Sequence, residues 1–216
     1  MRKIKPFLIT FEGIEGSGKT YQSKKLYRRI LNSKLPVLYT REPGGTKVGE
    51  KIRDLILSDY FSKNKNDTLD KYTDTLLYLA ARNEHVKKII NPSLYKKKII
   101  ICDRFIDSTF AYQVYGKKVN NELINIIHKN ILNGIKPDIT FILKTDINKA
   151  LQRLKKRRKK NRYDKFTKKF YMKVQSAFLK LSKSNKRKYF VVDNSFDTPE
   201  TEKKIFNHFS QYIKIQ

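Results

Sequence analysis

The sequence predicts an α/β fold: three layers, α/β/α, around a five-stranded parallel sheet. Two observations predict it. Short apolar runs alternate along the chain with segments of helical periodicity, which is typical of parallel sheets whose crossovers are helices. The chain has 216 residues, 39% of them hydrophobic, which is enough to bury the core of one domain. We therefore expect a single domain over residues 1–216.

The candidate strands are apolar, β-prone runs at 6–11, 36–40, 98–102, 138–144 and 188–193. The third contains Ile99-Ile100-Ile101-Cys102, which is apolar at every position. Such a strand is buried on both faces, because helices cover both sides of a parallel sheet. Ligands of these sheets collect at the carboxyl ends of the strands, so the residues that follow each strand are the first candidates for function.

Segments with helical periodicity lie between and after the strands, at 19–33, 46–58, 70–94, 105–133, 146–158, 163–184 and 198–213. Each is long enough to cross over from one parallel strand to the next.

The charge of the chain bounds its partners and its compartment. Lysine and arginine give a net charge of +29, but these residues are spread through nearly every predicted helix. This distribution favours a solvated lysine-rich surface over a specific nucleic-acid site. No apolar run is long enough to span a bilayer, and the single cysteine, Cys102, can form no internal disulfide. We therefore expect a cytoplasmic protein with no membrane partner.

A glycine-rich loop follows the first strand and reads Gly13-Ile14-Glu15-Gly16-Ser17-Gly18-Lys19-Thr20. The pattern G-x-x-x-x-G-K-[ST] between a strand and a helix is typical of loops that bind a nucleoside triphosphate. Its backbone N–H groups and the helix N-terminus face the phosphates, and we expect the Lys19 amine to reach the β- and γ-phosphates. The Thr20 hydroxyl is a candidate ligand of the accompanying Mg²⁺.

Charged residues also follow the second and third strands. Arg41 follows the second strand in the segment Thr40–Thr46, and a substrate role is at least as probable there as a simple Pro-Gly turn. Asp103 closes the third strand, where a carboxylate is placed to hold Mg²⁺ directly or through water. The adjacent Arg104 offers a planar fork for a phosphate, although a structural Asp–Arg pair is the alternative.

Two further segments carry candidate residues. Tyr78 and Arg82 lie four residues apart on one predicted helix and share a face, where they would stack on a flat ring and bond its edge. Residues 153–162 are strongly basic and join two predicted helices. Alone, this segment indicates a solvated or nucleic-acid-binding patch, but beside a phosphate loop it is typical of a lid for phosphoryl transfer.

Together these residues resemble the bacterial thymidylate kinase family. The resemblance runs essentially end to end and is carried by the segments Phe11–Thr20, Thr40–Thr46, Ala80–Arg82, Asp103–Phe105 and Ser108–Gln113. It implies a P-loop kinase fold with a mobile basic lid at about 153–163. The implied reaction is Mg²⁺-dependent transfer of the ATP γ-phosphate to dTMP, giving dTDP and ADP.

The resemblance also implies roles for individual residues. For the acceptor, Arg104 holds its phosphate with Arg41 nearby, Glu15 contacts the sugar 3′-OH, and Tyr112 lies against the deoxyribose. For the base, Tyr78 stacks on thymine, Arg82 reaches O4 and Thr109 reaches the N3/O2 edge; Pro43 and Ser108 complete the substrate site. For the reaction, Lys19 bridges the two phosphates, while Thr20 and Asp103 arrange Mg²⁺.

Members of the family that this chain resembles differ in where the catalytic arginine sits. Position 16 of the loop is glycine here, so the resemblance implies a catalytic arginine in the lid, where the candidates are Arg153, Arg157 and Arg162. The resemblance further implies a homodimer. Two alternatives stay open at this point: another P-loop kinase acting on a deoxynucleotide or deoxynucleoside, and a basic nucleic-acid-binding ATPase.

Overall fold

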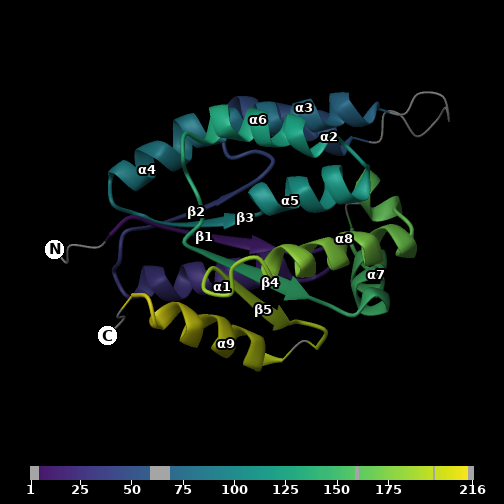
Figure 1. Cartoon of the computed structure of the whole chain (residues 1–216). Helices are drawn as coiled ribbons and strands as arrows, with labels where there is room; N and C mark the ends of the chain where they lie inside the picture. The colour runs from purple at the N-terminus through teal and green to yellow at the C-terminus, as the bar shows by residue number, and fades with distance from the viewer. Residues whose placement is uncertain (1–4, 59–68, 159–160, 197, 214–216) are drawn as a thin grey trace.

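A computed structural model describes residues 5–58, 69–158, 161–196 and 198–213. Its centre is a parallel sheet of five strands in the order β2-β3-β1-β4-β5 (Figure 1). The strands are β1 (Phe7–Glu12), β2 (Val37–Arg41), β3 (Ile99–Asp103), β4 (Ile139–Lys144) and β5 (Tyr189–Asp193). Each begins one residue after the run that predicted it. The predicted α/β class, strand number and parallel arrangement are therefore confirmed.

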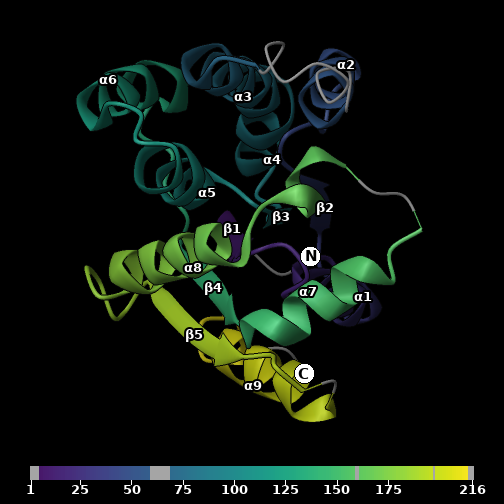
Figure 2. The ribbon, with the colours of Figure 1, turned by 90° about the vertical axis from the view of Figure 1, so that its right-hand side faces the viewer.

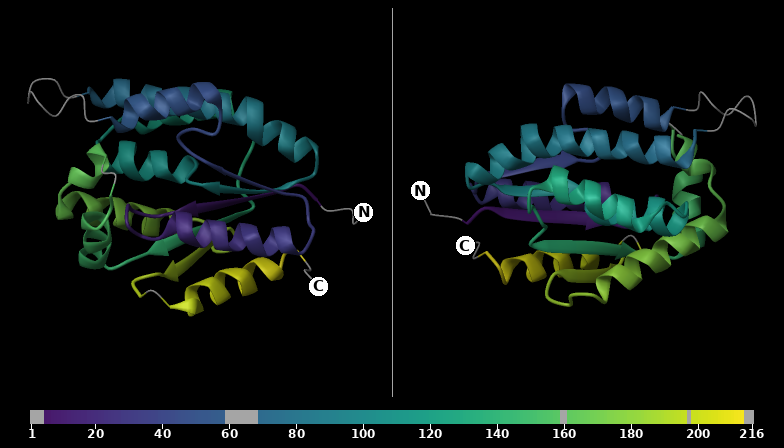
Figure 3. Two further views of the ribbon diagram at one scale, coloured as in Figure 1. Left: turned by 180° about the vertical axis from the view of Figure 1, so that it is seen from behind. Right: turned by 45° about the horizontal axis from the view of Figure 1, so that its top comes forward.

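Helices cover both faces of this sheet because side chains alternate along each strand. On β1, Ile9 and Phe11 pack with Leu26 and Ile30 of one helix and with Phe209 of another. The intervening Leu8 packs on the opposite face with Ile100 and Val86. The view from behind in Figure 3 shows the first face, with the purple-blue α1 and the yellow α9 side by side.

The helical elements are α1 (Lys19–Asn32), α2 (Lys47–Leu57), α3 (Lys71–His85), η1 (Val86–Ile90), α4 (Asn91–Tyr95), α5 (Ile106–Thr109), η2 (Phe110–Gly116), α6 (Asn121–Leu132), α7 (Ile147–Lys155), η3 (Arg162–Lys165), α8 (Lys168–Ser182) and α9 (Pro199–Ser210). The predicted segment 70–94 is continuous, with a π-helical turn at η1 between α3 and α4. Within the described ranges, no helix is both long and apolar enough to cross a membrane.

Two predicted helices are interrupted. The segment 105–133 breaks between η2 and α6, where Lys118 has a left-handed φ of 57°. Asn120 then caps α6, because its side chain accepts a hydrogen bond from the backbone N–H of Leu123 at 2.9 Å. The segment 163–184 breaks after η3, and Thr167 caps α8 in the same way through the N–H of Phe170 at 3.2 Å. Predicting each as one helix was wrong, because a cap residue can start a new helix within a periodic pattern.

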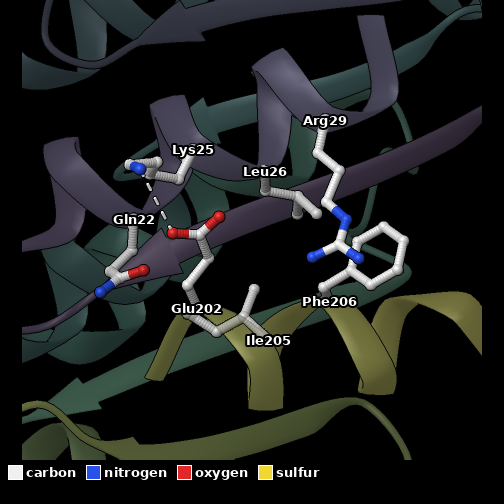
Figure 4. Close-up of a pocket in the computed structure, with 7 residues that line it drawn as sticks. All are labelled: Gln22, Lys25, Leu26, Arg29, Glu202, Ile205 and Phe206. Atoms are coloured by element: carbon white, nitrogen blue, oxygen red, sulfur yellow. Dashed lines mark ion pairs between the residues drawn. The ribbon is translucent and has the colours of Figure 1, made fainter. Parts of the chain in front are cut away.

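The seam between α1 and α9 is packed rather than hollow (Figure 4). The guanidinium of Arg29 lies 3.3 Å from the ring centroid of Phe206. One turn away, the Lys25 amine and the Glu202 carboxylate form an ion pair at 3.4 Å. This seam fixes α1, and therefore the loop that precedes it, against the rest of the sheet.

Candidate active site

A cavity of about 790 Å³ opens at the carboxyl edge of the sheet, the edge that faces the viewer in Figure 2. The loops after β1, β2 and β3 form its floor, α3 and η2 form one wall, and the basic segment after α7 forms another. Most predicted site residues line it. The exceptions are Gly13, Ile14 and Ser17, which belong to the glycine-rich loop, and Arg162.

The glycine-rich loop has a backbone that only glycine adopts easily. Gly16 and Gly18 have φ values of 74° and 86°, in the left-handed region. A Cβ at position 16 would lie 2.4 Å from the carbonyl oxygen of Ala150. Any side chain at position 16 would therefore clash with the backbone of α7.

The Lys19 amine is folded back into this loop. Its Nζ donates a hydrogen bond to the carbonyl of Ile14 at 2.6 Å, and the side chain is buried. Burial, together with the nearby Arg104 cation, lowers the pKa of Lys19 to about 7. The amine is therefore held at a desolvation cost that an anionic ligand would relieve.

Thr20 and Asp103 meet across the ends of α1 and β3. The Thr20 hydroxyl donates a hydrogen bond to Asp103 Oδ2 at 2.5 Å. The other oxygen, Asp103 Oδ1, is buried and has no hydrogen-bond partner in the described residues. A hydroxyl beside an unpartnered carboxylate oxygen suits a hard cation such as Mg²⁺, which takes one or two protein oxygens and completes its shell with phosphate and water. No cluster of three His, Cys, Asp or Glu side chains competes for a metal among those residues.

Arg104 is a cation of the cavity wall that several hydrogen bonds hold in place. Its φ of 72° is unusual for a residue with a side chain. Its guanidinium donates to the carbonyl of Gly13 at 3.0 Å, to the Ser108 hydroxyl at 3.1 Å and to Glu15 at 2.8 Å. The Glu15 carboxylate also accepts a hydrogen bond from the Tyr112 hydroxyl. Glu15 thus ties the phosphate loop, the arginine and the tyrosine into one wall.

Sequence analysis missed Glu12, which ends β1 beneath this wall. Its carboxylate is fully buried and accepts hydrogen bonds from the backbone N–H of Phe105 at 2.8 Å and from the Ser108 hydroxyl at 2.6 Å. Burial raises the pKa of Glu12 to about 8, with the Asp107 carboxylate adding to the rise. Glu12 thus holds the segment that directly follows Arg104. An acidic residue closing an apolar strand is the signal that would have found it.

Most N–H groups of the Arg82 guanidinium are hydrogen-bonded within the protein. It donates to Glu42 at 2.8 Å, to the Thr109 hydroxyl at 2.7 Å, to His128 Nε2 at 2.7 Å and to the carbonyl of Phe105 at 2.8 Å. A guanidinium has five N–H groups. These bonds engage four of them, so one N–H is left toward the cavity that Arg82 lines. Glu42, the carboxylate of the segment Thr40–Thr46, is buried and balances this charge.

Aromatic side chains from α3, η2 and η3 meet beside Arg104. Tyr78 meets Tyr163 edge to face, with ring centroids 6.3 Å apart. Tyr163 also meets Tyr112, at 5.8 Å. The Tyr163 side chain comes from η3, at the end of the basic segment, and was not predicted. Tyr78 and Tyr163 both line the cavity.

Two arginines lie at the mouth of the cavity, near Pro43. Arg41 is half exposed and pairs with Glu50 at 2.8 Å. Arg53 donates to the carbonyl of Pro43 at 2.8 Å, and burial lowers its pKa. Arg53 was missed, yet it lies at helical spacing from two buried residues of α2, Gly49 and Ile56. A cation on the buried face of a helix is a signal that sequence analysis could have used.

The basic segment brings its arginines to different places. Arg153 donates to the carbonyl of Gly16 in the phosphate loop at 3.1 Å. Arg157 pairs with Asp164 at 3.2 Å and lines the cavity. Arg162 lies outside the cavity lining, on Asp74. Residues 159–160 of the predicted lid fall outside the described residues.

Comparisons with known proteins agree with this geometry. The family model described as thymidylate kinase matches residues 11–205. A thymidylate kinase of Ehrlichia chaffeensis is 41% identical over 209 residues, which cover 96% of this chain and 97% of that protein. A thymidylate kinase of Wolbachia sp. subsp. Brugia malayi is 46% identical over 177 residues, covering 81% and 80%.

A solved structure shows the same likeness. The crystal structure of thymidylate kinase from Ehrlichia chaffeensis superposes with a TM-score of 0.73 at 35% identity, over 95% of this chain and 98% of that one. The glycine-rich loop, the Asp103–Arg104 pair and the lid arginines all fall within the matched residues. With a family model that spans most of its length and relatives that align nearly end to end, the chain belongs to the thymidylate kinase family.

Proposed function

We propose that the protein transfers the γ-phosphate of ATP to dTMP in a Mg²⁺-dependent reaction, giving dTDP and ADP. The observation that carries the proposal is the bridge at Glu15. This carboxylate belongs to the loop that would hold the donor phosphates, and it binds Arg104, which would hold the acceptor phosphate. Donor and acceptor sites thus share one wall. Family membership supplies the identity of the two substrates.

At the donor side, the loop from Gly13 to Thr20 cradles the ATP phosphates. Lys19 leaves the Ile14 carbonyl and bridges the γ-phosphate of ATP and the phosphate of dTMP. Thr20 and Asp103 hold Mg²⁺, which neutralises charge on the β- and γ-phosphates when bound. The unpartnered Asp103 Oδ1 supports this assignment.

At the acceptor side, Arg104 holds the dTMP phosphate, with Ser108 beside it and Arg41 at the mouth. Glu15 accepts a hydrogen bond from the sugar 3′-OH. Tyr112 packs where a ribose 2′-OH would collide, so the site favours deoxyribose. Its hydroxyl bond to Glu15 supports this fixed position.

The base enters between Tyr78 and the loop at Pro43. Tyr78 stacks on the thymine ring. The free N–H of Arg82 donates to O4, while the Thr109 hydroxyl meets the N3/O2 edge. Arg82 and Thr109 are already bonded to each other at 2.7 Å, which supports their action as one unit.

The reaction needs positioning and charge neutralisation rather than a covalent intermediate. An oxygen of the dTMP phosphate attacks the γ-phosphorus, and the bond from that phosphorus to the β–γ bridging oxygen breaks to release ADP. Lys19 and Arg104 hold the two phosphates in line. Arg153 and Arg157 close over them and exclude water, and Arg162 completes the lid set that the sequence predicts.

A coupled assay of ADP release tests this function. With Mg-ATP we expect strong turnover of dTMP, weak turnover of dUMP and negligible turnover of the ribose counterpart of dTMP. Removing Mg²⁺ with a chelator should abolish the signal. Activity only with other monophosphates or with nucleosides would favour a different P-loop kinase. ATP hydrolysis stimulated by nucleic acid, and weakened by salt, would favour the nucleic-acid-binding ATPase.

We also propose that residues 1–216 form one kinase domain, that it acts in the cytoplasm, and that it works as a homodimer. The buried free thiol of Cys102 supports a reducing compartment. Exposed apolar side chains on neighbouring helices support the dimer: Tyr72 and Leu76 on α3, Leu55 on α2 and Ile126 on α6. These helices lie side by side on one face of the molecule (Figures 1 and 2).

A paired substitution tests the dimer. Leu76→Glu with Ile126→Glu puts charges on this face, where they would be buried unpaired in a dimer. Light scattering after size exclusion should give twice 25.6 kDa for the parent and 25.6 kDa for the variant. Met172→Glu on α8 changes an equally exposed side chain elsewhere and should leave the mass unchanged. A parent that runs as a monomer would refute the dimer.

A further inference from the structure

A buried carboxylate outside the cavity joins three separate segments. Asp74, in the first turn of α3, has 0% exposed surface. One of its oxygens binds the Lys117 amine at 2.6 Å, from the turn after η2. The other binds the Arg162 guanidinium, from the end of the basic segment. Asp74 is not part of the cavity lining.

The position of Arg162 is set by this contact. Within the described part of the chain, Arg162 Nε is buried and has no hydrogen-bond partner. A buried charge with a missing partner is costly, so the guanidinium stays where Asp74 balances it. Its exposed fraction of 17% leaves little room for a second position in this state.

Arg162 in turn places its neighbour Tyr163. The guanidinium lies 5.1 Å from the Tyr163 ring, and the Lys117 amine lies 5.7 Å from the same ring. The ring is 3% exposed and packs against Tyr78 and Tyr112.

We propose that Asp74 is a positioning residue for the dTMP site: it docks the end of the lid through Arg162 and so seats Tyr163 as the wall facing Tyr78. Arg162 then acts through this dock and does not touch the phosphates, unlike Arg153 and Arg157. The proposal rests on the proposed function, since the wall that Asp74 sets is the dTMP pocket.

Trypsin and steady-state kinetics test the dock together. The bonds after Lys155, Arg157 and Arg158 are trypsin sites in the lid, and mass spectrometry identifies their cleavage without any turnover. We expect Asp74→Asn and Arg162→Gln each to raise lid cleavage and the KM for dTMP about tenfold, because both variants lose the Asp74–Arg162 ion pair, with a smaller change in kcat. The double variant should be no worse than either single variant.

Two controls separate docking from general loss of packing. Lys117→Met removes the other partner of Asp74 but leaves the dock, and Glu84→Gln removes a partly exposed ion pair on the same helix. In both variants trypsin should cleave the lid at near the rate of the parent. Equal loosening by Lys117→Met would overturn the proposal.

Two further results would also overturn it. One is unchanged lid cleavage in Asp74→Asn or, should that variant not fold, in Arg162→Gln. The other is a large loss of kcat in Arg162→Gln with the lid still protected, which would place Arg162 on the phosphates. Should the parent turn over no dTMP, the proposed function fails, while the cleavage result still decides whether Asp74 docks the lid.

Discussion

Lys19→Met should abolish turnover without lowering the melting temperature of the ligand-free protein. In the reaction the amine carries charge between two phosphates, and loss of such a group costs on the order of a thousandfold in kcat or more. In the free protein the same amine is buried, with its pKa lowered to about 7. Its removal therefore relieves a desolvation cost, as is common where function opposes stability.

The pH dependence of the parent follows from the same group. The pKa of Lys19 is about 7 in the folded chain, whereas the ordinary pKa of lysine, 10.5, applies in the unfolded chain. Between these two pH values the unfolded chain therefore binds more protons than the folded chain. The Lys19 contribution to unfolding free energy therefore rises with pH across that window. The charged amine that attracts ATP is lost over the same window in the free enzyme. We expect kcat/KM for ATP to fall above about pH 7 in the parent.

Lys25→Met is the matched control, because it makes the same change on the same helix. Lys25 lies on the α1–α9 seam and pairs with Glu202 at the surface (Figure 4). Its kinetics should match those of the parent. Turnover by Lys19→Met within tenfold of the parent, measured by ADP release, would remove the role assigned to Lys19.

Arg104→Ala should raise the KM for dTMP and lower kcat, for a combined loss on the order of a thousandfold or more in kcat/KM. The acceptor phosphate loses its planar clamp, and a misplaced phosphate is out of line for transfer. The KM for ATP should change much less, since the glycine-rich loop is intact. Steady-state kinetics with each substrate varied in turn separate the two effects.

A glycine at the same position distinguishes chemistry from folding. Residue 104 has a φ of 72°, which glycine adopts without strain. Arg104→Gly should therefore melt at or above the temperature of Arg104→Ala while being equally impaired. Arg104→Lys keeps a charge but not the fork, and we expect it to recover only part of the activity. Near-parent kinetics in the alanine variant would refute the assignment.

The sheet was predictable because its signals are local. Every residue of the run Ile99–Cys102 is apolar, which indicates a buried strand, and the polar Asp103 directly after it marks the end of that strand. The glycine-rich loop is likewise a contiguous pattern whose backbone demands are visible in the residue types. The cavity lies where these local signals converge, at the carboxyl ends of the strands.

What was missed depends on residues that are distant in sequence. Glu12 receives its hydrogen bonds from residues 93 to 96 positions away. Arg162 binds Asp74, which lies 88 positions away in the sequence. The sequence of the lid alone therefore could not show that Arg162 and Arg153 have different contacts. The breaks after η2 and η3 depend on caps that interrupt a pattern without changing its periodicity. Such features need the fold before they can be recognised.

The network around Arg82 has a consequence for which bases the pocket rejects. Four N–H groups of the Arg82 guanidinium are already hydrogen-bonded, so the group is held in one orientation. A guanidinium also has no hydrogen-bond acceptor, so it can only donate to the base. Thymine offers a carbonyl at the position that the last N–H would meet, whereas cytosine offers an amino group. Two donors would then face each other in a dry pocket, each without a partner. With Arg82 at the base as proposed, we expect discrimination against dCMP to need no extra contact, because Glu42 and Thr109 hold the guanidinium in place.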